Sequence, residues 1–187
     1  QHLIHSDISS IMRLAQSYQQ DGIPRATMAG VSIAHLFYES STRTAMSFQL
    51  AAAQLGADNL VIQPERSAAS KGERILETIQ TIAAMGVRYF VMRHQQNGLP
   101  ETIAHSCPNI HLLNAGDGNN QHPSQALLDL YTILQHCADI SNSVVAIVGD
   151  IKHSRVARSL CDLLCAFGVK ELRFVTDPSL LPAEDMC

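Results

Sequence analysis

The sequence predicts an α/β fold in which a mainly parallel sheet has helices on both faces. Short apolar runs alternate with segments of helical period along the whole chain. Strands joined in turn by helices require crossover connections, which are right-handed and give parallel pairing. The short runs are also continuously apolar, as a sheet covered on both faces requires.

The first half of the chain is predicted to hold an amphipathic helix followed by strand and helix units. The predicted helices are 8–20, 44–55 and 73–85, and the predicted strands are 31–38, 59–63 and 88–93. Gly56 and Gly86 stand where the second and third helices should end. Glycine is favoured there because it adopts the left-handed backbone conformation without steric cost.

The second half continues the alternation. It is predicted to contain a short helix at 100–106, a strand at 110–115, a helix at 123–137, a strand at 143–150, a helix at 154–167 and a strand at 171–175. Pro123 suits the first turn of its helix, where the missing N–H costs nothing. The polar segment 138–142 predicts a boundary between a domain at 1–140 and a second at 141–187. The second is too short to close a doubly wound domain, so we expect the chain to be truncated.

Composition narrows the class of protein. The 187 residues are 46% apolar and 16% charged, as in globular proteins. The net charge of −4 argues against a nucleic-acid partner. No apolar run reaches the ~20 residues of a membrane span, and no secretory signal is visible. The five cysteines have irregular spacing and no CxxC pair, so we expect a reduced, cytoplasmic protein without disulfides or zinc.

Polar side chains follow the predicted strands, and ligands bind beyond the carboxyl ends of strands in open α/β sheets. The candidate site residues are Ser41, Thr42, Arg43, Thr44, Ser67, Lys71, Arg93, His122, Gln125 and Arg155. The stretch "ESSTRTAMSF" places several hydroxyls and a guanidinium at a helix start. One hydroxyl is enough to cap a helix, so the excess favours an anion site.

The candidate residues predict electrostatic chemistry. They are cations and hydrogen-bond donors, without a convincing pair of carboxylates or a Ser–His–Asp or Cys–His arrangement. Such a set can bind a phosphorylated substrate and stabilise developing negative charge. It would act by positioning two reactants, without metal, cofactor or covalent intermediate. The strand "VAIVGD" lacks the glycines of a dinucleotide site.

Five stretches together resemble the catalytic chain of aspartate carbamoyltransferase. They are "FYESSTRTAMSFQLAAAQLGA", "SKGER", "VMRHQQNG", "NAGDGNNQHPSQALLDLYT" and "VGDIKHSRVARS". They stand in the family's order and spacing, and the resemblance covers about residues 2–175. The Ser-Thr-Arg-Thr and His-Pro-x-Gln motifs mark carbamoyltransferases generally, and the "NAGDG" form is similar to the aspartate branch.

The resemblance implies transfer of a carbamoyl group from carbamoyl phosphate to L-aspartate, an early step of pyrimidine synthesis. It implies that Ser41, Thr42, Arg43 and Thr44 cradle the phosphate. Thr44, Arg93 and His122 would hold the carbonyl oxygen, and Gln125 the carbamoyl amine. Ser67 and Lys71 would reach the site of a neighbouring subunit, with Lys71 also contacting aspartate, and Arg155 would bind an aspartate carboxylate.

The family forms trimers with shared active sites, so the resemblance implies a homotrimer. The sequence does not show whether regulatory chains or a dihydroorotase partner bind to it. Two other functions remain. One is a related carbamoyltransferase that uses ornithine or another acceptor, and the other is a non-catalytic homologue retained for assembly. The candidate arginines and His122 are all present in the sequence, which favours an enzyme over a non-catalytic homologue. The truncated chain is nevertheless expected to be inactive alone.

Overall fold

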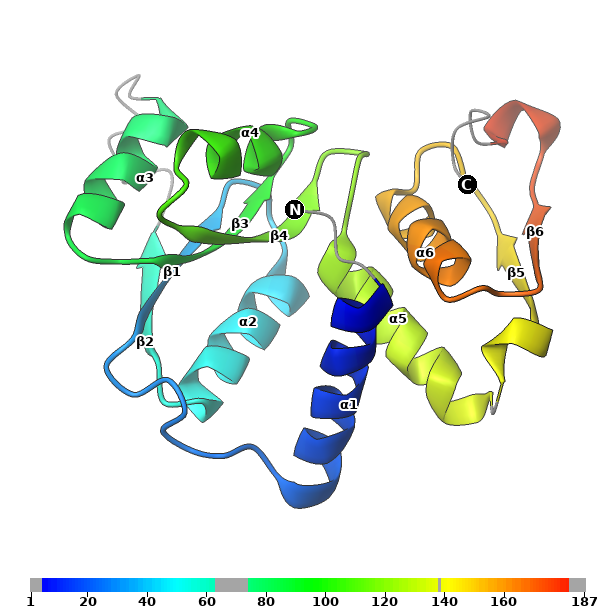
Figure 1. Ribbon diagram of the computed structural model, residues 1–187. Helices are drawn as coiled ribbons and strands as arrows, with labels where there is room; N and C mark the ends of the chain where they lie inside the picture. The colour runs from blue at the N-terminus through cyan, green and yellow to red at the C-terminus, as the bar shows by residue number, and fades with distance from the viewer. Residues whose placement is uncertain (1–4, 63–73, 138, 182–187) are drawn as a thin grey trace. The chain divides into compact units, whose positions relative to one another are not determined.

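The computed structural model describes residues 5–62, 74–137 and 139–181, and it confirms the α/β class (Figure 1). The chain forms two compact units. One is Gly22–Gly118, and the other joins Gln1–Asp21 to Asn119–Cys187. The division near residue 140 stays a prediction. None of the described helices is long and apolar enough to cross a membrane.

The unit Gly22–Gly118 is built on a four-stranded parallel sheet. Its order is β2 (Asp58–Ile62), β1 (Ser32–Phe37), β3 (Tyr89–His94), β4 (His111–Asp117). The connecting helices are α2 (Thr42–Gln54), α3 (Ile75–Ala84) and α4 (Leu99–Ser106). The predicted parallel pairing is therefore confirmed for these strands.

Alternate side chains of the central strands enter two separate cores. Leu36 of β1 and Phe90 of β3 pack with Ile79 of α3, in a cluster that also takes in α4. Ile33 and Val91, of opposite parity on the same strands, pack on the other side in a cluster with α2. Successive residues of a strand point to opposite faces, so α2 covers one face and α3 with α4 cover the other.

The second unit combines helices with a two-stranded parallel sheet. It contains α1 (His5–Asp21), α5 (Pro123–His136), β5 (Val144–Val148), α6 (Arg155–Ala166) and β6 (Glu171–Val175). Two short 3-10 turns, Ile140–Asn142 and Pro178–Leu180, were not predicted. Ile8 of α1, Leu130 of α5 and Leu164 of α6 are fully buried together in its core.

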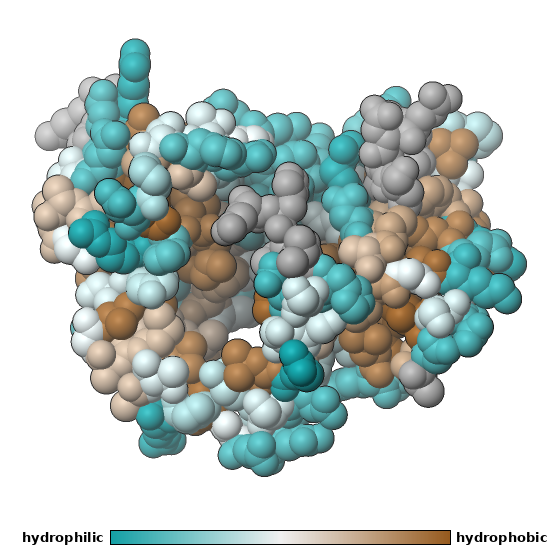
Figure 2. Space-filling model, viewed as in Figure 1, coloured by the Kyte–Doolittle hydropathy of each residue, from teal (hydrophilic) through white to brown (hydrophobic). Residues whose placement is uncertain are grey.

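The β5–β6 sheet differs from the expectation of strands covered on both faces. Among the described residues, burial alternates along both strands, and Val148 and Val175 are 73% and 52% exposed. Figure 2 shows apolar side chains at the surface of this part of the chain. The apolar runs predicted the strands correctly, but within the described residues one face of this sheet is packed, against α6, and the other is exposed.

The predicted element boundaries agree with the structure to within about three residues. Gly56 and Gly86 follow α2 and α3 with φ of +82° and +101°, the left-handed conformation that the sequence predicts. A side chain at Gly56 would meet the backbone of Ala26 at 3.0 Å, a second reason for glycine there. Helix α2 begins at Thr42, so three of the residues predicted to bind phosphate, Thr42, Arg43 and Thr44, form its first turn, and Ser41 directly precedes it.

Candidate functional site

The mouth of helix α2 is the first part of the candidate site. Ser41 is the residue that precedes the helix, and Thr42, Arg43 and Thr44 form its first turn. The first N–H groups of a helix have no partner within it, and the helix dipole is positive at this end. Arg43 is exposed here and adds a full positive charge.

Helix capping does not account for these hydroxyls. Ser41 makes no side-chain capping hydrogen bond. Among the described residues, the hydroxyls of Thr42 and Thr44 likewise have no recorded hydrogen-bond partner. The hydroxyls of Ser41, Thr42 and Thr44 are therefore available to a ligand, together with the backbone N–H groups beside them.

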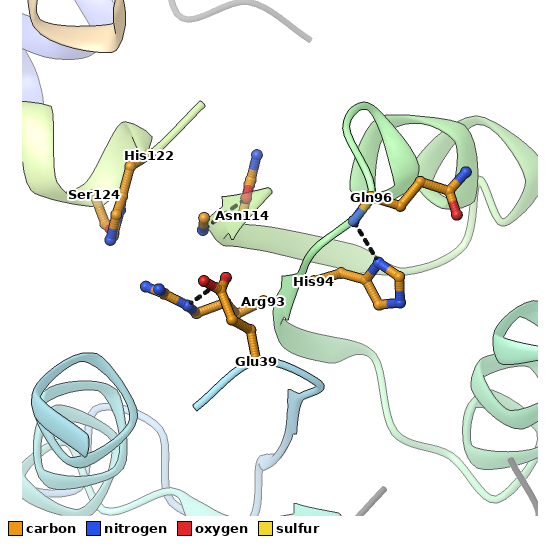
Figure 3. A network of polar contacts seen from close by, with 8 residues as sticks. Glu39, Arg93, His94, Gln96, Asn114, His122 and Ser124 are labelled. Carbon is orange, nitrogen blue, oxygen red and sulfur yellow. Dashed lines mark hydrogen bonds and ion pairs between the residues drawn. The ribbon is translucent and has the colours of Figure 1, made fainter. Parts of the chain in front are cut away.

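Arg93 lies next to this mouth because β1 and β3 are neighbours. Phe37 and Arg93 are paired across the two strands, and the Tyr38 N–H donates to the Arg93 carbonyl at 2.9 Å. Only 7% of the Arg93 residue is exposed. Its Nε donates to Oε2 of Glu39 at 3.1 Å, an ion pair between residues 54 positions apart (Figure 3).

This ion pair indicates what Arg93 can bind. The Glu39 carboxylate is an oxyanion against a nearly buried guanidinium, which is the contact that a phosphate oxygen would make. Glu39 is 35% exposed in its side chain and directly precedes the hydroxyl-rich turn. An incoming phosphate would therefore compete with Glu39 for Arg93.

His94 follows Arg93 and leaves the strand in the opposite direction (Figure 3). The Gln96 N–H donates to its Nδ1 at 2.9 Å, so the neutral ring carries its proton on Nε2. Burial lowers the pKa of His94, and the nearby Glu39 charge opposes this shift. His94 is therefore a neutral imidazole at and above pH 7.

A buried carboxylate joins the loops that follow β3 and β4. Asp117 is 1% exposed, and its Oδ2 accepts from the Gly98 N–H at 2.7 Å. Its Oδ1 accepts from the Asn114 amide at 2.9 Å, and the Asn114 Oδ1 accepts from the Gly116 N–H. The Gly118 N–H donates to the His94 carbonyl at 2.9 Å. These bonds hold the segment after Arg93 against the end of β4.

The second unit carries His122 at the start of α5. His122 is 6% exposed, and its backbone N–H donates to Oγ of Ser159 on α6 at 2.9 Å. Its Nδ1 lies 3.4 Å from Oγ of Ser124. Pro123 occupies the first turn, as the sequence predicts. The imidazole is therefore held where α5 begins.

Gln125 directly follows Ser124 in the first turn of α5. Its Nε2 donates to Oδ1 of Asp129 at 2.9 Å. This bond directs the amide nitrogen to Asp129, so the carbonyl Oε1 is the end that can accept a hydrogen bond from an amine.

Arg155 is the first residue of α6. Ser154 caps this helix by accepting from the Ala157 N–H at 3.1 Å. Before it, Asp150 accepts from the His153 backbone N–H at 3.1 Å and contacts His153 Nδ1 at 3.0 Å. These hydrogen bonds from His153 lower the pKa of Asp150. The turn before Arg155 is thus fixed by local bonds.

The predicted site residues divide between the two units. Ser41, Thr42, Arg43, Thr44 and Arg93 belong to Gly22–Gly118 and lie around the ends of β1 and β3. His122, Gln125 and Arg155 belong to the other unit. Ser67 and Lys71 lie outside the described residues. In the described part of the chain, no three His, Cys, Asp or Glu residues are grouped as a metal ion would require.

One hollow in the described residues lies away from these side chains. It has a volume of about 560 Å³ and is lined by Ile23, Arg25, Ala53, Gln54 and Gly56. This is the C-terminal end of α2, where the helix dipole is negative. The chemistry of the residues, rather than the size of the hollow, therefore places the candidate anion site at the opposite end of α2.

Several residues of these networks were not predicted from the sequence, among them Glu39, Asp117, Ser159 and Asp129. Glu39 and Asp117 act across strands that only the sheet order brings together. Ser159 meets His122 across 37 residues. Asp129 could have been found, because it stands four residues after Gln125 on one helix face.

The class of protein follows from comparison with known families. Residues 1–135 match the model of the carbamoyl phosphate-binding domain of the aspartate/ornithine carbamoyltransferases. The chain belongs to this family, as the resemblance of its motifs implies. Its similar relatives include proteins of the aspartate branch. The aspartate carbamoyltransferase catalytic subunit of Coxiella burnetii (strain RSA 493 / Nine Mile phase I) is 46% identical over 186 residues.

Solved structures agree. Aspartate transcarbamoylase from Trypanosoma cruzi, in complex with carbamoyl aspartate and phosphate, superimposes with a TM-score of 0.89 at 31% identity. The catalytic subunit of M. Jannaschii aspartate transcarbamoylase gives 0.86 at 33% identity. The matches cover 96% of this chain for the Coxiella protein and 98% for both structures. The chain spans 59%, 60% and 61% of those relatives' lengths, respectively.

Proposed function

We propose that the chain takes part in the transfer of a carbamoyl group from carbamoyl phosphate to the amine of L-aspartate, which gives N-carbamoyl-L-aspartate and phosphate. One observation carries most of the argument. The hydroxyls of Ser41, Thr42 and Thr44 stand at a helix mouth, and Ser41 does not cap the helix. Hydroxyl and N–H donors that are not used to cap the helix, at its positive end, can bind a phosphate.

Carbamoyl phosphate would bind with its phosphate at this mouth. The hydroxyls and backbone N–H groups from Ser41 to Thr44 would bind its oxygens, and Arg43 would add charge. Arg93 would exchange the Glu39 carboxylate, now 3.1 Å from its Nε, for the oxygen of the substrate. A guanidinium that is only 7% exposed loses little further hydration when an anion replaces a carboxylate.

The carbonyl group would be polarised by Thr44, Arg93 and His122. As the aspartate amine attacks, the carbonyl oxygen becomes negatively charged, and preorganised donors stabilise this charge. Gln125 would accept from the carbamoyl amine through Oε1, the end of its amide that Asp129 leaves available. The work is positioning and electrostatic stabilisation, so no covalent intermediate is needed.

The acceptor and the assembly belong to the same proposal. Arg155, at the start of α6, would bind a carboxylate of aspartate. The Trypanosoma cruzi enzyme has been solved in complex with carbamoyl phosphate and aspartate, and this neighbour supports aspartate as acceptor. We further propose that Ser67 and Lys71 serve the site of a neighbouring subunit in a homotrimer, and that the enzyme is cytoplasmic.

An assay of the native enzyme tests the proposal. Carbamoyl phosphate is supplied with aspartate or with ornithine, and the carbamoylated product is measured. Arg93→Ala should lower kcat by about 10²–10³, the loss expected for one donor to a developing oxyanion. Arg88→Ala is the matched control, because Arg88 is exposed just before β3 and its side chain donates only to the Ala83 carbonyl in the described part of the chain.

Each outcome has a distinct meaning. Carbamoyl aspartate as the product, with loss in Arg93→Ala alone, supports the proposal. Carbamoyl ornithine as the product would replace aspartate by the other acceptor of the family. Binding of carbamoyl phosphate without transfer of its carbamoyl group to either acceptor would favour a non-catalytic homologue.

A further inference from the structure

The side chain of His122 raises a question that its proposed role leaves open. A neutral imidazole carries one proton, on either Nδ1 or Nε2, and only the protonated nitrogen can donate. A histidine that polarises a carbonyl oxygen must present N–H to it. Something must therefore decide which nitrogen of His122 holds the proton.

Ser124 is the group that meets one of these nitrogens. Its Oγ lies 3.4 Å from Nδ1 of His122; Ser124 is in the first turn of α5, and His122 is the residue that directly precedes this helix (Figure 3). A hydroxyl can either donate or accept, so the contact alone does not assign the proton. The surroundings of the hydroxyl do.

The hydroxyl of Ser124 has one acceptor within reach. In the part of the chain that the structure describes, Nδ1 of His122 is its one recorded hydrogen-bond partner. The start of a helix presents free N–H donors rather than carbonyl oxygens. A hydroxyl proton at this place therefore points to Nδ1, which then serves as an acceptor and leaves the ring proton on Nε2.

The backbone of His122 limits the alternatives. Its N–H is bonded to Oγ of Ser159 at 2.9 Å, and Pro123 restricts the backbone of His122, the residue directly before it. The ring can therefore move only about its own side-chain bonds. Hydrogen bonds of this kind are often long in the free protein and shorten when substrate binds, so a separation of 3.4 Å is compatible with the assignment.

We propose that Ser124 is a positioning residue that fixes the tautomer of His122, so that Nε2–H is the donor to the carbonyl oxygen of the substrate. This inference rests on the proposed function for the identity of that oxygen. Ser124 itself does not touch the substrate. It acts through the imidazole, by making Nδ1 the accepting nitrogen.

The protein contains its own reference for the experiment. Nδ1 of His94 accepts from the Gln96 backbone N–H at 2.9 Å, and a backbone N–H can only donate. His94 therefore gives the nitrogen signals of an Nε2–H ring. The signals of His122 can be compared with these in the same spectrum.

The test is nitrogen NMR on protein labelled with ¹⁵N-histidine, at about pH 8, where an unperturbed imidazole is neutral. The variants are Ser124→Ala, which removes the hydroxyl, and Ser124→Thr, which keeps it. Ser106→Ala is the control, because the Ser106 hydroxyl bonds the Thr102 carbonyl on the exposed surface of α4. A His122→Asn variant assigns the His122 signals.

We expect His122 to match His94 in the native protein, in Ser124→Thr and in Ser106→Ala. In Ser124→Ala its signals should shift toward a mixture of tautomers. In the native enzyme assay, Ser124→Ala should lower kcat roughly two- to tenfold, the effect of one neutral hydrogen bond, and Ser124→Thr should restore it. Binding of inorganic phosphate should not change.

Two results would overturn the inference: an Nδ1–H ring in the native protein, or a tautomer that Ser124→Ala leaves unaltered in a folded sample. Thermal unfolding of each variant shows that it is folded. The NMR measurement needs no substrate, so it decides the role of Ser124 even if the enzyme transfers no carbamoyl group. In that case the proposed function fails separately.

Discussion

Replacing Asp117 tests whether its buried carboxylate holds the segment after Arg93 in place. The residue is 1% exposed and receives hydrogen bonds from the Gly98 N–H at 2.7 Å and the Asn114 amide at 2.9 Å. In Asp117→Ala both donors lose their acceptor. In Asp117→Asn the bond from Gly98 can be kept, but two amide NH₂ groups then face each other.

The magnitudes follow from these bonds. A hydrogen bond to a charged group contributes about 1.5–3 kcal/mol, so Asp117→Ala, which removes the acceptor of both bonds, should cost about 3–6 kcal/mol of unfolding free energy. Asp117→Asn should cost about 1–3 kcal/mol, because one bond is lost and a buried donor is left unpaired. Against a typical domain stability of about 5–15 kcal/mol, either loss is large.

The pairing itself is tested by exchanging the two residues in the double variant Asn114→Asp/Asp117→Asn. The carboxylate placed at position 114 can still accept from the Gly116 N–H, and it can also accept from the amide placed at position 117. The carbonyl oxygen of that amide remains as the acceptor for the Gly98 N–H. Urea unfolding should show that the double variant recovers at least half of the loss of Asp117→Asn. If the loss in the double variant equals the sum of the losses in the single variants Asn114→Asp and Asp117→Asn, the arrangement is refuted.

Three further predictions concern other parts of the unit Gly22–Gly118. Burial lowers the pKa of His35, while the hydrogen bond with Asn59 acts in the opposite direction, so the folded state favours the neutral ring. The contribution of His35 to stability should be fully present above about pH 6.5 and should fall as the pH drops below that value, and urea titrations of a His35→Gln variant should show a weaker pH dependence. Glu39→Gln should tighten binding of inorganic phosphate about two- to fivefold in calorimetry by releasing Arg93, and weaker binding would mean that Glu39 helps to form the site. Gly118→Ala should cost about 1–3 kcal/mol in thermal unfolding, since φ is +49° and a Cβ would lie 2.6 Å from the Gln95 carbonyl; an unchanged midpoint would contradict this geometry.

The alternation of apolar runs and helical periods was sufficient to predict the fold class. Helix ends at Gly56 and Gly86 followed from a local property of glycine, so no tertiary information was needed. The exposed face of β5 and β6 could not be predicted, because an apolar run indicates a strand without showing what covers it.

The candidate site was predictable as residue types but not as a network. Strand ends located Arg43 and Arg93, because ligands in such sheets bind beyond the carboxyl ends of strands. The ion pair of Arg93 with Glu39 depends on the pairing of β1 with β3, which local sequence does not contain. For the same reason the bonds of Asp117 and Ser159 required the structure.

The most direct test of the account measures binding of carbamoyl phosphate to this chain by the shift in thermal unfolding, with inorganic phosphate as a parallel ligand. A ligand at about 100 times its Kd should add about 2.7 kcal/mol to the stability of the state that binds it. Arg43→Ala should abolish this gain, and Arg13→Ala, which removes an exposed arginine of α1, should preserve it. Stabilisation that survives in Arg43→Ala would contradict a phosphate site at the mouth of α2.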